Sequence, residues 1–419
     1  MKLIRKFEPI AVTGIGVITA QGGHAEDTWR GIASATDVLK PWAYSLPREL
    51  RHIQVAACPE YSRPADLPAR LWNNLSRTQQ LACISSDEAL RSAGLSPHRS
   101  SDDPPMGCFI GTTVCGMDLS ERFYQQYRMN ADAADIELMR RMQPYEVLSL
   151  LSRRHHLNGP GYMNLTTCVG SAMAIGAACD AIHAGRCEVA LAGGSEALCQ
   201  LLISGFNSLR LVASDGCRPF DRDRPGITVG EGSAMLILES IDNVRQRGVN
   251  PIGYITGFSA TCDAYHITKP EPAGTRAAQA VRQALHDADV APRQVDYINA
   301  HGTGTRDNDA TEAMVIHEVF DSCPEIPPVS STKRLTGHTF GAAGAIEAVI
   351  CLLAIQHGVL PPNAGSRDPD PQCNLPLVRA AISKPLQIAL SCNLAFGGNN
   401  TALVFARTVP EMSVMETRL

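Results

Sequence analysis

The chain of 419 residues lacks the features that mark several broad classes of protein. No stretch reaches the eighteen or so uncharged apolar residues of a membrane span. A net charge of -5 gives no basic field for nucleic acid or anionic lipid. The segment Met1–Phe7 is basic but has no apolar secretory core after it. We therefore expect a cytoplasmic protein with no nucleic-acid partner and no membrane segment.

Cysteine is plentiful, but its spacing excludes two common uses. The 14 cysteines are scattered singly, with no C-x-x-C pair and no dense disulfide framework. Low-complexity segments are also absent. A hydrophobic content of 44% over this length permits a large buried core.

Mixed α/β structure is expected along the whole chain. Ile10–Ile18, Gly107–Gly111 and Ser233–Glu239 are typical of buried strands, and Leu75–Ala93 of an amphipathic helix. A strand, a loop and a helix of small apolar residues occur twice, around Cys168 and again at Gly341–Gly358. We predict two related halves, residues 1–250 and 251–409, that face each other, and a loose tail over 410–419.

Cys168 is distinguished from the other cysteines by its position. It follows a short extended segment and precedes the Ala/Gly-rich run from Ala172 to Gly185, which predicts a helix. The positive end of a helix dipole and its unpaired N–H groups stabilise a thiolate. The sequence therefore predicts a low pKa and a nucleophilic sulfur at Cys168.

Three further motifs follow apolar strands, where the catalytic groups of α/β folds gather. His301 lies in Asn299–Thr305, and His338 ends the segment Ser331–His338. The third motif, Cys392–Asn400, contains a glycine-rich turn whose N–H groups suit a developing anion.

Each motif also has a simpler interpretation. A lone cysteine is usually an inert buried residue, and a lone histidine is usually structural. Cys168, His301 and His338 have residue types that suit zinc, but none has a ligand partner at short spacing. Gly14 and Gly16 match part of a dinucleotide fingerprint, but its third glycine is replaced by Thr19. For Glu312 we slightly favour a solvated helix face.

Taken together, the motifs resemble the β-ketoacyl-acyl-carrier-protein synthases of the thiolase superfamily, from about Pro9 to Ala406. The resemblance rests on a set of segments besides the three active-site motifs: Val12–Val17, Ala192–Glu196, Arg218–Asp223, Gly230–Gly232, Asp263–Thr268, Gly341–Glu347 and Phe396–Gly398. Cys-His-His in this order is similar to the elongating type, since initiating synthases usually show Cys-His-Asn. The resemblance implies an α/β, thiolase-like, five-layer αβαβα fold and an acyltransferase.

The resemblance also implies roles for residues of this chain. Cys168 carries the acyl group, His301 and His338 hold the malonyl carbonyl, and Lys333 pairs with Glu347, with Asp309 in the same network. The N–H groups of Cys168 and Phe396 form the oxyanion hole. The remaining implied roles are pantetheine binding by Thr303 and Thr305, an acyl pocket and gate formed by Phe396, Thr113, Val114 and Thr268, and carrier docking by Arg210, Arg70 and Arg77. No metal or cofactor is implied, since acyl carrier protein delivers its substrates on phosphopantetheine.

Four departures from the elongating pattern affect acyl preference. Ala395 replaces a glycine before the gate, Asn399 a threonine, and Thr113 a glycine, while Val169-Gly170 replace small polar residues. They favour a specialised polyketide or polyene synthase over a housekeeping fatty-acid enzyme.

Two other functional hypotheses stay open on the sequence. A non-catalytic chain-length partner subunit usually lacks the nucleophile, which is present here. A thiolase needs a second cysteine in the C-terminal loop, where only Cys392 precedes the turn. The sequence leaves open whether the chain forms a homodimer or pairs with a related subunit.

Overall fold

The computed structural model describes residues 7–42 and 53–408. Its largest sheet has ten strands in the order β11-β10-β14-β15-β9-β1-β8-β6-β4-β5. The first half contributes β1 (Ile10–Ile18), β4 (Met106–Gly111), β5 (Gly161–Asn164), β6 (Val189–Glu196) and β8 (Gly232–Glu239). The second half contributes β9 (Gly253–Cys262), β10 (Tyr297–Asn299), β11 (Val329–Ser330), β14 (Ile388–Leu394) and β15 (Asn399–Ala406).

The two halves repeat one pairing pattern. In the first, β4 lies parallel to β5 and β6, and β8 runs antiparallel to β6 and β1. In the second, β10 lies parallel to β11 and β14, and β15 runs antiparallel to β14 and β9. The halves meet where β1 pairs antiparallel with β9, with Ile10 opposite Ile255. The predicted internal repeat is therefore present in the topology.

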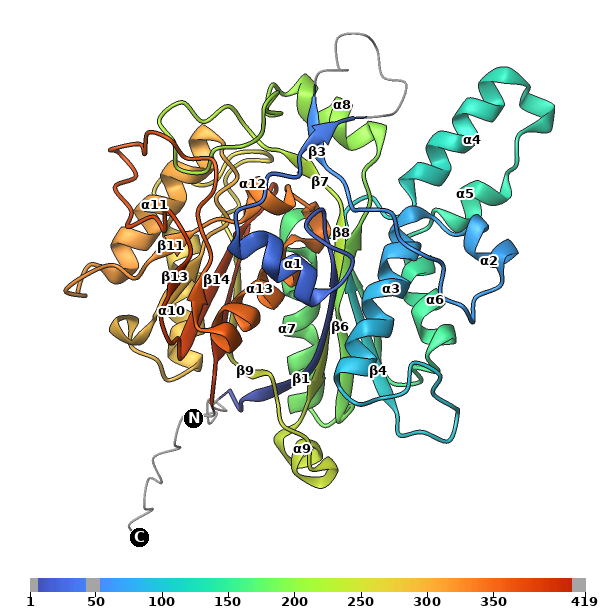
Figure 1. Cartoon of the computed structure of the whole chain (residues 1–419), viewed down its shortest axis with the longest axis horizontal. Helices are drawn as coiled ribbons and strands as arrows, with labels where there is room; N and C mark the ends of the chain where they lie inside the picture. The colour runs from blue at the N-terminus through green and yellow to red at the C-terminus, as the bar shows by residue number, and fades with distance from the viewer. Residues whose placement is uncertain (1–6, 43–52, 409–419) are drawn as a thin grey trace.

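Helices cover the outer faces of the halves and fill the space between them (Figure 1). On the outside, α3 (Arg77–Ser92) and α6 (Tyr145–Arg154) pack on the first half, and α10 (Thr275–Asp287) and α11 (Arg306–Phe320) pack on the second. Between the halves lie α7 (Gly170–His183) and α13 (Ala343–His357).

Strand alternation explains this layering, because successive side chains of a strand point to opposite faces. On β8, Leu236 and Leu238 join the central core with α7 and α13, whereas Met235 and Ile237 join the outer core with α3 and α6. On β15, Phe405 faces the centre. The two halves of the ten-stranded sheet, which are joined where β1 pairs with β9, form the two sheet layers. The order of layers is therefore helix, sheet, helix, sheet and helix, which confirms the predicted fold class.

One stretch, Phe340–His357, is long and apolar enough to cross a membrane by length and composition alone. It contains the charged Glu347, so it is not an uncharged apolar run of the kind that the sequence lacks. It consists of η5 (Phe340–Ala342) and α13. Because 89% of it is buried between the two halves, it is a helix of the protein core.

Candidate active site

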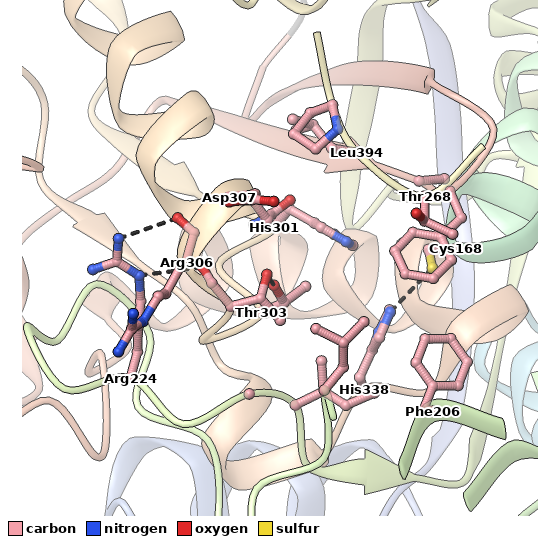
Figure 2. Close-up of a pocket in the computed structure, with 18 of the residues that line it drawn as sticks. Cys168, Phe206, Arg224, Thr268, His301, Thr303, Arg306, Asp307, His338 and Leu394 are labelled. Atoms are coloured by element: carbon pink, nitrogen blue, oxygen red, sulfur yellow. Dashed lines mark hydrogen bonds between the residues drawn. The ribbon is translucent and has the colours of Figure 1, made fainter. Parts of the chain in front are cut away.

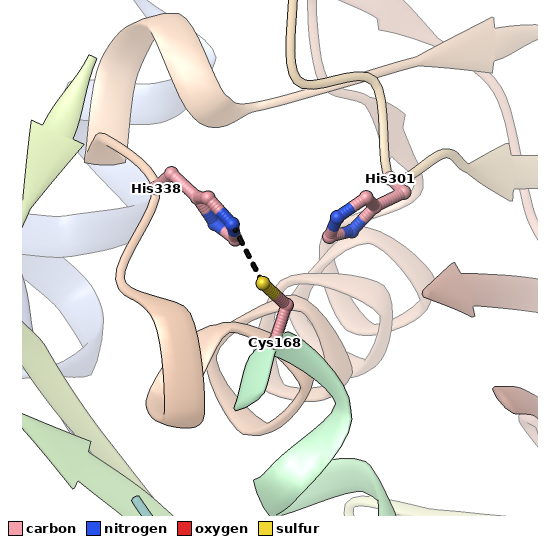
Figure 3. A group of neighbouring side chains, drawn as sticks. All are labelled: Cys168, His301 and His338. Carbon is pink, nitrogen blue, oxygen red and sulfur yellow. Dashed lines mark hydrogen bonds between the residues drawn. The ribbon is translucent and has the colours of Figure 1, made fainter. Parts of the chain in front are cut away.

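Three strand-end motifs come together at one place. The Nε2 atom of His338 lies 3.1 Å from the sulfur of Cys168. The ring centroids of His301 and His338 are 5.3 Å apart and nearly perpendicular. Figure 3 shows the two imidazoles on either side of the sulfur. The predicted convergence of Cys168, His301 and His338 is therefore present, and all three are buried.

Cys168 lies in a strained turn between β5 and α7. The preceding residue, Thr167, has a φ of 44°, a region that β-branched residues rarely adopt. Its hydroxyl donates a 3.1 Å hydrogen bond to the carbonyl oxygen of Phe396. The backbone N–H groups of Phe396 and of Cys168 itself both point at the sulfur. Two N–H donors therefore converge where a tetrahedral oxyanion would form beside it.

The predicted low pKa of Cys168 is wrong. Burial raises the pKa of the thiol to about 12, and the nearby Lys333 charge and the two N–H groups lower it only in part. Desolvation penalises the thiolate more than the local helix end stabilises it. The resting sulfur is a thiol, so its attack requires a base, and Nε2 of His338 is within reach.

The protein fixes the protonation state of His301. Lys333 Nζ lies 3.2 Å from Nδ1 and donates at 2.6 Å to the His301 carbonyl oxygen, and the Asn393 amide nitrogen lies 3.4 Å from Nδ1. An ammonium has only donors, so Nδ1 must be the acceptor and Nε2 must carry the hydrogen. Burial, and then the charge of Lys333, holds the pKa of His301 well below its usual range. His301 thus presents a neutral N–H to the cavity.

His338 is held differently. Its backbone N–H donates to the Thr228 carbonyl at 2.7 Å, and its ring packs 4.7 Å from that of Phe340. Its Nδ1 is buried with no hydrogen-bond partner among the described residues. Burial lowers the pKa of this imidazole well below its usual range. Because no group locks Nδ1, His338 can accept a proton at Nε2 and later donate one.

Lys333 and Glu347 form the predicted buried pair. Lys333 begins α12 (Lys333–Thr336), and its ammonium donates to Oε1 of Glu347. Oε2 of the same carboxylate accepts from the Asn393 amide. Burial raises the pKa of Glu347, and Lys333 counteracts that rise. Removing either partner would leave an uncompensated buried charge.

Two predictions about acidic residues are wrong. Glu312 is buried, and its two oxygens accept the N–H groups of His301 at 2.6 Å and Gly302 at 2.7 Å. Asp309 does not contact the Lys333–Glu347 pair; its carboxylate accepts the N–H groups of Phe220 and Gly304. Both carboxylates hold the loop that carries His301.

Cys168 lines a cavity of about 410 Å³. Figure 2 shows the residues around it. The predicted residues that line it are Cys168, Arg210, Thr268, His301, Thr303, Thr305, His338 and Phe396. The hydroxyls of Thr303 and Thr305 are 2.9 Å apart. The ring of Phe396 stacks at 5.5 Å on Phe206, a residue that the sequence analysis missed.

Thr113 and Val114, predicted for the acyl pocket, are not among the residues that line this cavity. Their N–H groups donate to the buried Glu196, which also accepts from the N–H of Gly341 at 3.2 Å. Val114 packs against the apolar cluster that contains Cys168. Glu196 therefore ties the loop after β4 to η5, just beyond His338.

The three arginines predicted to dock a carrier differ in their surroundings. Arg210 is exposed and lines the cavity. Arg70 is exposed on α2 (Ala69–Asn74) and does not line it. Arg77 is paired internally with the buried Glu231 at 2.5 Å and donates to the Tyr61 hydroxyl. The Arg77 guanidinium is thus held by Glu231 and Tyr61 inside the protein, and it is not free to dock a carrier.

Among the described residues, the donor atoms of Cys168, His301 and His338 lie within 4.8 Å of one another, close enough to hold a metal ion. The ammonium of Lys333, 3.2 Å from Nδ1 of His301, opposes a dication there. The same atoms equally suit a thioester: one sulfur, one fixed N–H and one imidazole free to exchange a proton.

The fold and this site together define a thiolase-like acyltransferase. Models of the β-ketoacyl synthase N-terminal and C-terminal domains match residues 7–243 and 252–367. The chain therefore belongs to the β-ketoacyl synthase family.

Relatives span nearly the whole chain. It is 34% identical over 401 residues to nodulation protein E of Rhizobium leguminosarum bv. trifolii, covering 94% of this chain and 98% of the relative. It is 33% identical over 413 residues to 3-oxoacyl-[acyl-carrier-protein] synthase 2 of Synechocystis sp., covering 95% and 98%.

Solved structures agree with this assignment. The ishigamide ketosynthase/chain length factor superposes with a TM-score of 0.88 at 29% identity, covering 96% of this chain and 99% of that one. A β-ketoacyl synthase from Burkholderia phymatum gives 0.87 at 28%, covering 96% and 100%. A ketosynthase in complex with its chain length factor from Xenorhabdus doucetiae gives 0.80 at 28%, covering 97% and 100%.

Proposed function

We propose that this chain is a β-ketoacyl-acyl-carrier-protein synthase that condenses malonyl carrier with an acyl chain held on Cys168. The observation that carries the proposal is the site itself: a thiol beside two neutral imidazoles and two converging N–H donors. The chemistry as written needs no metal or cofactor beyond the phosphopantetheine on the carrier.

Acyl transfer comes first. The Cys168 sulfur attacks the thioester carbonyl, and its proton passes to Nε2 of His338. The N–H groups of Cys168 and Phe396 hold the tetrahedral oxyanion; such a donor is typically worth about 3 kcal/mol. The carbon–sulfur bond to pantetheine then breaks, and His338 returns the proton to the departing thiolate.

Malonyl thioester then loses carbon dioxide. The electrons of the breaking carbon–carbon bond move into an enolate, whose oxygen needs donors. His301 supplies its fixed Nε2–H, and His338 supplies a second once it carries its hydrogen on Nε2, a tautomer change in which Nδ1 gives one proton to water and Nε2 takes one from water. Neutral imidazoles suffice here, and the lowered pKa values of both histidines keep them neutral at physiological pH.

Condensation completes the cycle. The enolate carbon attacks the acyl carbonyl on Cys168, forms the new carbon–carbon bond and breaks the bond to the sulfur. The sulfur leaves as a thiolate and takes up one proton from water, the proton that decarboxylation of the malonyl carboxylate leaves the cycle short of. Cys168 is 5% exposed, and this burial limits competing hydrolysis of the acyl-enzyme.

For the pathway, we infer a type II polyketide, polyene or fatty-acid system, and we favour a specialised one. The departures at Ala395, Asn399 and Thr113 support this inference, as does the similarity to the ishigamide ketosynthase. The alternatives are a housekeeping elongating synthase and a non-catalytic chain-length subunit; the intact Cys168 speaks against the second. We place the enzyme in the cytoplasm.

Carrier docking follows from the cavity mouth. Arg210 and Arg306 line the cavity and are exposed, and neither forms an ion pair among the described residues. Thr303 and Thr305 line the same cavity, and their hydroxyls are the groups that we assign to the pantetheine amides. Arg306→Glu should raise the KM for an acyl carrier several-fold without changing the KM for a free acyl-pantetheine. Equal effects on both substrates would contradict docking at Arg306.

Assembly with a second subunit, either another copy or a related ketosynthase-like chain, is expected along β5. This strand is the outer edge of the ten-stranded sheet. Tyr162 on β5 and Leu165 just after it remain 37% and 47% exposed.

Intact-mass spectrometry tests the proposed reaction. Wild-type protein incubated with hexanoyl-pantetheine should gain one hexanoyl group, and subsequent malonyl-pantetheine should release 3-oxo-octanoyl-pantetheine. Cys168→Ala should gain none, while Cys392→Ala, another buried thiol, should label normally. Equal labelling of Cys168→Ala would overturn the assignment.

A further inference from the structure

Asn393 lies at the centre of the polar network behind the two histidines, although its motif suggested only a glycine-rich turn. It occupies β14, is 1% exposed, and pairs across the sheet with Thr401. Its amide nitrogen donates to Oε2 of Glu347 and lies 3.4 Å from Nδ1 of His301. Asn393 therefore contacts both the Lys333–Glu347 ion pair and the His301 ring beside that pair.

Chemistry fixes which way this amide points. If it were flipped, its oxygen would face the Glu347 carboxylate and the lone pair of His301 Nδ1, both of which are acceptors. In the observed orientation Oδ1 has no hydrogen-bond partner among the described residues. An unsatisfied buried oxygen costs free energy. The flipped amide would cost more, because its oxygen would face two acceptors and the hydrogen bond to Glu347 would be lost, so the contacts of the nitrogen determine the orientation.

Lys333 and Asn393 divide the Glu347 carboxylate between them. Lys333 donates to Oε1 and Asn393 to Oε2, so both oxygens are satisfied. With Glu347 held in this way, the ammonium stays 3.2 Å from Nδ1 of His301. The chain of contacts runs from Asn393 through Glu347 and Lys333 to the ring.

We propose that Asn393 is a positioning residue for decarboxylation: it holds the Glu347–Lys333 pair so that His301 presents its Nε2–H to the malonyl carbonyl. This role rests on the proposed function. It separates two halves of the reaction, because Cys168 acylation uses His338 and the backbone N–H groups, whereas enolate formation needs His301.

Packing alone is the competing explanation. A Cβ at Gly344 of α13 would lie 3.1 Å from Asn393 Oδ1, so Asn393 also fills space against that helix. A packing role predicts equal losses in both half-reactions. A positioning role predicts a loss in one.

Asn393→Ser tests this distinction, because serine is too short to reach Glu347. Synthetic hexanoyl-pantetheine reports Cys168 acylation by intact mass, and malonyl-pantetheine reports decarboxylation by release of acetyl-pantetheine. We expect decarboxylation to fall roughly tenfold or more while acylation changes less than about threefold, since a directly removed donor costs about 10²–10³. Normal acylation also shows that the variant is folded.

Asn299→Ser is the matched control. Asn299 is equally buried on β10, the strand beside β14, but its amide donates to the Tyr297 hydroxyl at 3.1 Å. It forms no hydrogen bond with Glu347 or with the His301 ring in the described structure. Both rates of this variant should stay near those of wild type.

Asn393→Asp adds a pH readout. This nearly isosteric change puts a second carboxyl beside Glu347, and one proton shared between the two restores a donor. Its decarboxylation rate relative to wild type should therefore rise as the pH falls from 8 to 6. The titratable groups that interact with Glu347 are Lys333, Cys168, Tyr297, Cys351 and Cys392. His301 and His338 interact with the Lys333 ammonium of the pair. Burial keeps the histidines, thiols and phenol of this set neutral over that range. Glu312, which accepts the His301 N–H and whose pKa burial raises to about 8, titrates over the same range in both proteins, so the ratio of variant to wild-type rate isolates the carboxyl pair.

The outcomes separate cleanly. Equal losses in both half-reactions, no loss in either, the same selective loss in Asn299→Ser, or a pH-independent Asn393→Asp would overturn the positioning role. Wild-type protein that neither acylates Cys168 nor decarboxylates malonyl-pantetheine would overturn the proposed function itself. A selective loss of decarboxylation with the pH-dependent recovery supports the role.

Discussion

At the scale of single residues, the buried Glu312 carboxylate holds the loop that carries His301 and makes the stability of the protein depend on pH. It accepts the N–H groups of His301 and Gly302, and burial raises its pKa to about 8. An unfolded glutamate titrates near 4.3, so the folded state binds this proton more tightly. Its contribution to stability is complete below about pH 4 and is lost as the pH rises through about 8, by up to about 1.4 kcal/mol per unit.

Glu312→Gln should remove that slope. The free energy of unfolding of the variant, from urea denaturation at pH 6, 7 and 8, should fall less with rising pH than that of wild type. At pH 6 the variant should be about 1–3 kcal/mol less stable, because the glutamine NH₂ faces one of the two N–H donors and leaves it unpaired. Parallel pH curves for the two proteins would contradict the role of Glu312.

Residue-scale errors of the sequence analysis share one cause. The sequence predicts that Cys168, His301 and His338 come together, because each follows a strand and strands can be recognised from local periodicity. The burial of Glu312, the pairing of Arg77 with Glu231 and the contacts of Asn393 depend on segments distant in sequence. The pKa predicted for Cys168 is wrong for the same reason: the helix end can be recognised in the sequence, but the burial that raises the pKa depends on distant segments.

At the scale of elements, the central helices α7 and α13 carry the chemistry and must approach closely. A Cβ at Gly344 would lie 2.8 Å from the Ala172 Cβ and 2.9 Å from its backbone nitrogen. The Ala/Gly-rich composition of both helices predicted burial, and the contact explains it. Because α7 follows Cys168 and α13 carries Glu347, their spacing sets the distance between the nucleophile and the ion pair.

Gly344→Ala should therefore destabilise the protein by about 1–3 kcal/mol through overpacking and lower the condensation rate. Gly205→Ala is the matched control in α8 (Gln200–Ser208), where an added Cβ meets nothing within 4 Å. It should be neutral or stabilising by up to about 1 kcal/mol. Urea denaturation compares the two, and equal effects would show that helix propensity, rather than the α7–α13 contact, governs Gly344.

At the scale of the whole molecule, the two halves match strand for strand, but only one outer edge lies next to the nucleophile. The sheet ends at β11 on one side and at β5 on the other, and the turn holding Cys168 begins just after β5. An exposed edge strand offers unpaired N–H and carbonyl groups to another chain. Pairing there would also brace the strained turn at Thr167.

Leu165→Lys should weaken this assembly, because it places a charge beside the edge strand at a side chain that is 47% exposed. In analytical ultracentrifugation the wild type should sediment at about twice its 45.0 kDa mass, alone or with a related subunit, and the variant should shift toward the monomer. Met314→Lys, at a similarly exposed residue on α11, should not change the mass. If pairing braces the Cys168 turn, acylation by hexanoyl-pantetheine should slow in Leu165→Lys and not in Met314→Lys. A monomeric wild type with full activity would contradict pairing along β5, because the nucleophile would then need no neighbour to hold its turn.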